Sequence, residues 1–146
     1  MILKATSILL VDDSPEDRTA TIRAFKRSGF DKPIYHCTDG DDALDYLYQR
    51  GSYANDAPTE RPSLILLDLN LPGTDGREVL EQLKADQQLR NIPVVVLTTS
   101  SDPRDVHASY RAGANSYIQK PIDRDALYNA IRQLKDYWFD VVLLPE

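Results

Sequence analysis

Cysteine is scarce in this sequence, and so are long apolar segments. Cys37 is the one cysteine among 146 residues, which excludes an internal disulfide and a metal site built from several thiolates. The apolar run at residues 8–11 is interrupted by Asp12 and is too short for a signal peptide or a transmembrane helix. We therefore expect a cytoplasmic protein that does not cross a membrane.

Basic charge is scarce as well. Lysine and arginine number 17 against 23 aspartates and glutamates, which gives a net charge of -6. Proteins that bind nucleic acid or anionic membranes present a basic surface, so we expect neither as a partner. The remaining composition, 42% hydrophobic and 27% charged, is that of an ordinary globular protein, and 146 residues suffice for one domain.

Short apolar runs alternate with segments of helical spacing along the chain. Runs rich in Ile, Leu and Val predict strands at residues 7–11, 64–67 and 94–97, and weaker runs predict strands at 34–37 and 116–118. Helices are predicted between and after them, at about residues 14–29, 41–49, 76–87, 103–112 and after Asp123. Strands that alternate with helices predict an α/β fold with a parallel sheet and helices on both faces.

Polar side chains follow or end four of the five predicted strands: Asp12, Asp13, Asp68, Asn70, Thr98 and Lys120. Because the carboxyl ends of parallel strands meet at one edge of a sheet, we expect these groups around one shallow pocket. Each has a simpler explanation by itself, since aspartates cap helices and turns, threonine is common in strands, and a lysine can be a solvated charge. A shared site explains why all of them lie at the same end.

The chemistry of these groups indicates phosphoryl transfer. Three neighbouring carboxylates repel one another unless a cation shares their site, and a site of oxygen ligands alone favours Mg2+. Asp68 is the best candidate nucleophile, because carboxylates can form acyl phosphates. Thr98 and Lys120 would then bind phosphoryl oxygens.

The segments ILLVDDSPED, LILLDLNLPGTDG, IPVVVLTTS and YIQKP, in this order and spacing, resemble the receiver domain of two-component response regulators. The resemblance extends through about Lys135. It implies a flavodoxin-like (βα)5 fold, a doubly wound five-stranded parallel sheet with strand order 2-1-3-4-5. It also implies that a sensor histidine kinase phosphorylates Asp68, and that self-phosphorylation and slow self-dephosphorylation are the only reactions of the chain.

The same resemblance implies a role for each site residue. The implied Mg2+ ligands are Asp12 (mainly through water), Asp13, Asp68 and the backbone carbonyl of Asn70. Thr98 and Lys120 are implied to bind the phosphoryl group, and Thr98 with Tyr117 to form a conformational switch. A cis peptide bond is implied between Lys120 and Pro121.

A narrower resemblance concerns the loop GSYANDAPTERP, the run DLNLPGTDGREVLEQLK and the ending DYWFDVVLLP. These segments are similar to the small stand-alone response regulators paired with phytochrome histidine kinases, although the cyanobacterial members tend to carry Ser where this chain has Pro121. The alternatives are a phosphorelay intermediate or phosphate sink for a non-photoreceptor kinase and, further off, a phosphatase with an aspartate nucleophile. Such a phosphatase needs a second acid two residues after its nucleophile, and Asn70 stands there.

The last residues continue beyond the fifth helical segment. We expect a receiver domain at residues 1–137, an apolar extension at 138–146 and no output domain, so that the signal passes to a downstream protein by contact. Trp138 can extend the inward face of the last helix, but several apolar residues remain without a place. The sequence therefore predicts a homodimer that uses the last helix and Trp138, Phe139, Val141 and Leu143.

Overall fold

The computed structural model describes residues 7–54 and 61–145, and its centre is a sheet of five parallel strands. These are β1 (Ile8–Val11), β2 (Ile34–Cys37), β3 (Leu64–Leu67), β4 (Val94–Thr98) and β5 (Ser116–Gln119). Their order is β2-β1-β3-β4-β5, so the predicted fold class and strand order are confirmed. Every residue of β1, β3 and β4 is buried, whereas the edge strands β2 and β5 are partly exposed, which explains their weaker apolar runs.

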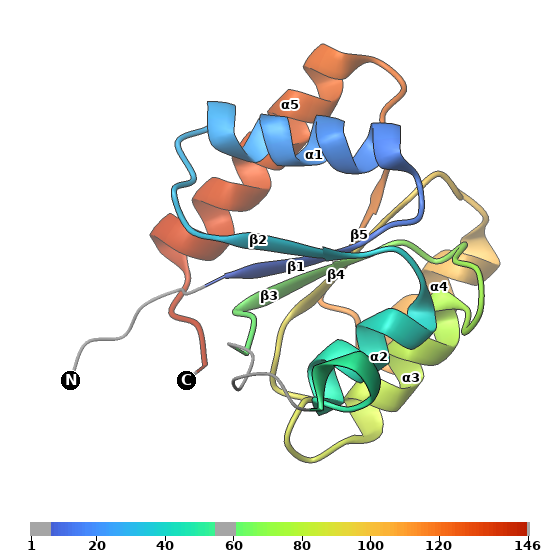
Figure 1. The fold of residues 1–146 in the computed structure, drawn as a ribbon. Coiled ribbons are helices and arrows are strands. Elements are labelled where there is room, and N and C mark those ends of the chain that lie inside the picture. The colour runs from blue at the N-terminus through green and yellow to red at the C-terminus, as the bar shows by residue number, and fades with distance from the viewer. Residues whose placement is uncertain (1–6, 55–60, 146) are drawn as a thin grey trace.

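Helices cover both faces of this sheet (Figure 1). One face carries α1 (Pro15–Arg27) and α5 (Arg124–Lys135), and the other carries α2 (Gly40–Tyr48), α3 (Gly76–Ala85) and α4 (Pro103–Ala112). A short 3-10 turn, Gly51–Tyr53, follows α2. None of the helices in the described part of the chain is long and apolar enough to cross a bilayer.

Each of the five helices α1 to α5 starts at a capping side chain that accepts a hydrogen bond from a backbone N–H of its first turn: Ser14, Asp39, Asp75, Asp102 and Asp123. The predicted boundaries therefore hold to within two residues. Helix α3 ends at Ala85, two residues before its predicted end, because the Asp86 carboxylate accepts hydrogen bonds from the N–H groups of Gln88 and Leu89.

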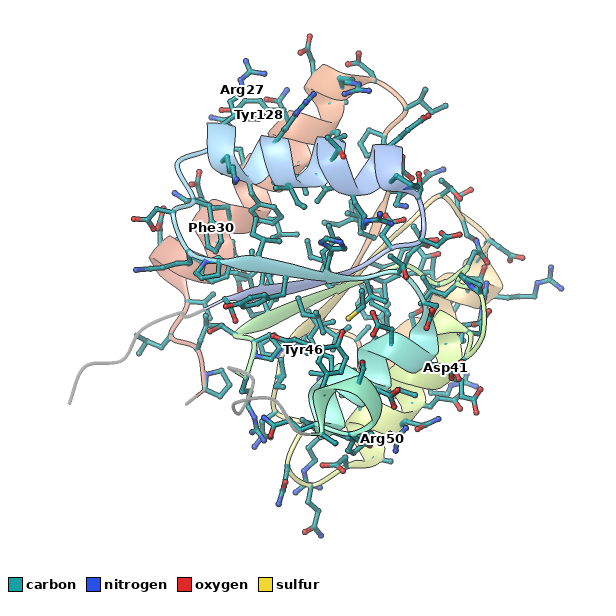
Figure 2. The ribbon with its side chains drawn as sticks, viewed as in Figure 1. Arg27, Phe30, Asp41, Tyr46, Arg50 and Tyr128 are labelled. Carbon is teal, nitrogen blue, oxygen red and sulfur yellow. The ribbon has the colours of Figure 1, made fainter. Side chains whose placement is uncertain are left out.

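The two faces of the sheet are packed by separate apolar clusters. Ile8 and Leu10 of β1 contribute to the cluster beneath α1 and α5, and Leu9 contributes to the cluster beneath α2, α3 and α4. The Arg27 guanidinium lies 4.0 Å from the centre of the Tyr128 ring, a cation–π contact that joins α1 to α5 (Figure 2). Both faces of the sheet are thus covered by helices, and the predicted site lies at the carboxyl ends of the strands.

The end of the chain continues α5 as one turn of π-helix, Asp136–Val141. Trp138 and Phe139 pack against the cluster beneath α1 and α5, and the Phe139 ring centre lies 4.8 Å from that of Phe30. Val141 and Leu143 are 71% and 84% exposed. The four residues predicted for a dimer interface therefore fall into two groups, two half-buried against the chain's own core and two in solvent.

Candidate functional site

The predicted site residues are fixed by hydrogen bonds that continue the sheet past its strands. The backbone N–H of Asp12 donates to the carbonyl of Cys37 at 3.1 Å, and that of Asp68 to Val11 at 3.0 Å. The N–H of Lys120 donates to the carbonyl of Thr98 at 2.6 Å. The ends of β1, β3, β4 and β5 therefore bring these side chains to one edge, as the sequence predicted.

The Lys120 ammonium lies between three carboxylates. Its Nζ is 2.8 Å from Asp12 Oδ2, 3.0 Å from Asp17 Oδ2 and 2.9 Å from Asp68 Oδ2, which engages all three of its donors. Burial acts to lower the pKa of Lys120, but the hydrogen bonds that its ammonium donates to Asp12 and Asp68 outweigh this effect, so its pKa lies well above the usual range. Lys120 is a fixed cation in a largely buried position.

Three carboxylates form an acidic cluster around the same point. Asp12, Asp13 and Asp68 each offer an oxygen within 4.8 Å of the others, with Asp12 and Asp68 buried and Asp13 exposed. Burial raises the pKa of Asp12, against the lowering effect of its hydrogen bonds from Lys120 and the Ser14 N–H. A cluster of oxygen donors that is open to solvent on the Asp13 side fits a hard divalent cation such as Mg2+.

Thr98 adds an unpaired hydroxyl to this edge. Its Oγ1 is fully buried, and no described residue forms a hydrogen bond with it. A buried hydroxyl without a partner is rare and costs free energy, and the Thr98 hydroxyl is free to bind a ligand at this edge. Asn70 is exposed beside the cluster, and its N–H lies 3.4 Å from Asp68 Oδ1; its carbonyl as a ligand stays a prediction.

The comparisons with known proteins agree with this geometry. The family model of the response regulator receiver domain matches residues 8–132. The chain belongs to that family. Response regulator Rcp1 of Synechocystis sp. is 43% identical over 138 residues, which cover 94% of this receiver and 92% of Rcp1. A probable methanogenesis regulatory protein of Methanothrix harundinacea, FilR2, is 42% identical over 133 residues, covering 90% and 82% of the two chains.

Two solved structures resemble this receiver over nearly its whole length. The Mn(2+)-bound form of Rcp1 has a TM-score of 0.89 at 42% identity, and the phosphorylated cyanobacterial phytochrome response regulator RcpA has 0.89 at 40% identity. In both comparisons 97% of this chain and 99% of the other are covered. The predicted family and fold are thus confirmed.

Tyr117 of β5 is linked by hydrogen bonds to the loop after β4 and, through that loop, to α4 and α3. Its hydroxyl donates to the carbonyl of Ser100 at 2.9 Å, and the Ser100 hydroxyl donates to Asp105 Oδ2 at 2.7 Å. Arg77 of α3 donates from Nε to Asp105 Oδ1 at 3.0 Å. The half-buried Tyr117 ring is therefore tied to the loop that follows Thr98.

One expectation about the receiver site is wrong. No peptide bond in residues 7–54 and 61–145 is cis, so the bond between Lys120 and Pro121 is trans. Lys120 reaches the pocket nonetheless, because its N–H continues the pairing of β5 with β4 and its ammonium is held by carboxylates from three elements.

Asp17 is the site residue that sequence reasoning missed. It lies in the first turn of α1, where an acidic residue is already explained by the cap and the helix dipole. The signal available in the sequence was its position four residues after Asp13, at the start of a helix that leaves directly from the pocket.

Proposed function

We propose that Asp68 of this receiver accepts a phosphoryl group from a phosphohistidine of a sensor histidine kinase. The observation that supports this most is the position of the buried Asp68 carboxylate, inside an acidic cluster and 2.9 Å from the Lys120 ammonium. A carboxylate oxygen of Asp68 forms the new P–O bond while the P–N bond breaks, and the electron pair of that bond stays on the imidazole nitrogen. No general base is required, because the nucleophile is already deprotonated.

The other residues of the site bind the metal ion and the transferred phosphoryl group. Asp12, Asp13, Asp68 and the carbonyl of Asn70 would hold Mg2+, which neutralises charge on the carboxylates and the transferred group. The Lys120 ammonium pairs with one phosphoryl oxygen, and the unpaired Thr98 hydroxyl donates to another. Self-phosphorylation from small donors and slow self-dephosphorylation follow as the only reactions of the chain.

We further propose that the partner is a phytochrome histidine kinase, with the reaction in the cytoplasm. RcpA, a phytochrome response regulator by its name, supports this by its likeness over nearly the whole chain. The sequence identity of this chain to FilR2 is about the same as its identity to Rcp1. A role as phosphorelay intermediate or phosphate sink for a non-photoreceptor kinase is therefore the competing assignment. Phosphotransfer profiling against every histidine kinase of the source genome separates the two, because the cognate kinase transfers fastest.

Thr98 and Tyr117 form the proposed switch. Movement of the Thr98 hydroxyl toward a phosphoryl group on Asp68 shifts the loop that begins at residue 99. Tyr117 is hydrogen-bonded to that loop at Ser100, so the shift is transmitted to the exposed side of β5. A downstream protein that docks there would distinguish the two states.

We also propose that the receiver forms a homodimer through α5 and the tail. Val141 and Leu143 are exposed apolar side chains of the tail, and Tyr137, which precedes them in the chain, is 55% exposed. Trp138 and Phe139 anchor the tail to its own domain and so present the exposed pair in a fixed position.

Acetyl phosphate with Mg2+ tests the central proposal. We expect intact-mass spectrometry to detect one added phosphoryl group on the wild type and none on Asp68→Asn, because the amide is not a nucleophile for phosphorus. Asp31→Asn, an exposed aspartate of the loop after α1, is the matched control and should be modified as the wild type is. Equal modification of Asp68→Asn and the wild type would overturn the assignment.

A further inference from the structure

Lys120 has one ion-pair partner that stands outside the acidic cluster. Asp17 Oδ2 lies 3.0 Å from Lys120 Nζ, but Asp17 shares no cluster with Asp12, Asp13 and Asp68. The Asp17 side chain is 45% exposed, whereas that of Lys120 is 9% exposed. Asp17 therefore meets the ammonium at the solvent side of the pocket, and the other two partners meet it inside.

The first turn of α1 is fastened to the same pocket by other contacts. The Asp17 N–H donates to the Ser14 hydroxyl at 3.2 Å, and the Ser14 N–H donates to Asp12 Oδ1 at 3.0 Å. The Arg18 guanidinium donates to the Asp12 carbonyl at 3.0 Å. The Asp17 carboxylate is consequently carried by a turn whose position relative to Asp12 is set independently of Lys120.

The three carboxylates that pair with Lys120 differ in whether the proposed reaction engages them. A divalent cation at the cluster and the Lys120 ammonium compete for the same two carboxylates, Asp12 and Asp68, because both are positive. A phosphoryl group on Asp68 removes the charge of that carboxylate. Of the three carboxylates that pair with Lys120 in the described part of the chain, Asp17 is the one that neither the metal nor the phosphoryl group engages.

We propose that Asp17 is a positioning residue for Lys120. It holds the ammonium at the pocket when the metal and the phosphoryl group engage Asp12 and Asp68, and it weakens the lysine's competition with the metal. Lysine has a long, flexible side chain, so an ion pair with a carboxylate outside the cluster fixes the position of its ammonium group. This inference rests on the proposed function and adds a residue to it.

A double-mutant cycle on the unmodified full chain tests the inference. Mg2+ affinity is measured by titration calorimetry for the wild type, Asp17→Asn, Lys120→Met and the double variant. We expect Asp17→Asn to weaken Mg2+ binding about threefold to tenfold when Lys120 is present, because the ammonium then binds Asp12 and Asp68 more tightly. In the Lys120→Met background the same substitution should have less than a twofold effect.

Glu16→Gln is the matched control for charge alone. Glu16 lies in the same first turn, is exposed, and forms no ion pair with any residue in the described ranges. The Nζ–H signals of Lys120 in NMR spectra give a direct readout, assigned by their loss in Lys120→Met. With saturating Mg2+ they should persist in the wild type and in Glu16→Gln, broaden in Asp17→Asn, and return in part in Asp17→Glu.

Two results would overturn the inference. One is an equal effect of Asp17→Asn in both backgrounds, and the other is a persistent Lys120 signal in Mg2+-loaded Asp17→Asn. Urea unfolding of each variant verifies that it is folded, and Asp17→Asn retains the N–H that binds Ser14. Failure of the proposed function would appear in the wild type and in Asp68→Asn, whereas failure of this inference would appear only in the Asp17 variants.

Discussion

The Thr98 side chain places a hydroxyl where the described protein atoms offer it no hydrogen bond. Valine has nearly the same shape without the hydroxyl, and it is well suited to a buried strand. We expect Thr98→Val to increase the free energy of unfolding of the unmodified protein by about 1 kcal/mol, since a buried unsatisfied hydroxyl costs about 1–3 kcal/mol. Urea unfolding at neutral pH measures this effect.

Thr98→Ser is the matched control for this substitution. Serine keeps the hydroxyl and removes a buried methyl group, so it should lower the free energy of unfolding by about 1 kcal/mol. A loss of stability in Thr98→Val would contradict the interpretation of the hydroxyl as a group that awaits a ligand oxygen.

Single residues of the site were predictable where chemistry restricts the residue type. Asp12, Asp68 and Lys120 stand at strand ends, and the shared edge of a parallel sheet brought them together. Asp17 was missed because an acid in a first helical turn already has a sufficient local explanation. The ion pair of Arg77 with Asp105 was not predictable at all, because two exposed-looking charges 28 residues apart meet only when α3 and α4 are packed.

At the scale of elements, α3 and α4 are joined by the Arg77–Asp105 pair, and this contact predicts a pH dependence. The hydrogen bond from Arg77, followed by that from the Ser100 hydroxyl, lowers the pKa of Asp105 in the folded protein. A lowered pKa stabilises the fold at pH values above the ordinary aspartate range, and the contribution is lost as pH falls through the folded value. The wild type should therefore exceed Asp105→Asn in stability at pH 7 and lose that advantage in acid.

The expected difference is about 1 kcal/mol at pH 7, because the Arg77 side chain is 37% exposed and water screens the pair. Urea unfolding between about pH 5 and pH 3 should show the difference shrinking. Asp31→Asn, which removes an exposed charge, should stay within about 0.5 kcal/mol of the wild type throughout. A difference between wild type and Asp105→Asn that does not change with pH would contradict the role given to the carboxylate.

Element boundaries followed the sequence closely because capping chemistry is local. Ser14 and Asp123 start α1 and α5 where predicted, since each side chain binds an N–H within three residues of itself. Gly76 at the start of α3 shows what such local signals leave out. A Cβ there would lie 2.1 Å from the Asp68 carbonyl oxygen. Only glycine therefore allows this helix to approach the site so closely.

For the whole molecule, the alternation of strands and helices predicted the parallel sheet, and the resemblance supplied its order. The position of the tail was open from the sequence, because an apolar terminal segment can cover its own domain or a second copy. In the structure the tail does one of these in part: Phe139 packs against Phe30 on the chain's own core with the two rings tilted, whereas Val141 and Leu143 are in solvent. Removing the chain after Tyr137 would therefore damage the core as well as any interface.

Substitution of the exposed pair alone is the sharper test of the proposed homodimer. Val141→Ser combined with Leu143→Ser leaves Trp138 and Phe139 in place, so the fold should be retained. Burial of an aliphatic side chain contributes roughly 1.5–3 kcal/mol, and a symmetric interface buries each side chain twice. We expect the association constant from sedimentation equilibrium to fall at least about a hundredfold. Ile122→Ser, which changes a fully exposed aliphatic residue between β5 and α5, should leave association unchanged. An unaltered association constant in the tail variant would exclude the tail as the dimer contact, because no other change in that protein could compensate for two lost apolar side chains per protomer.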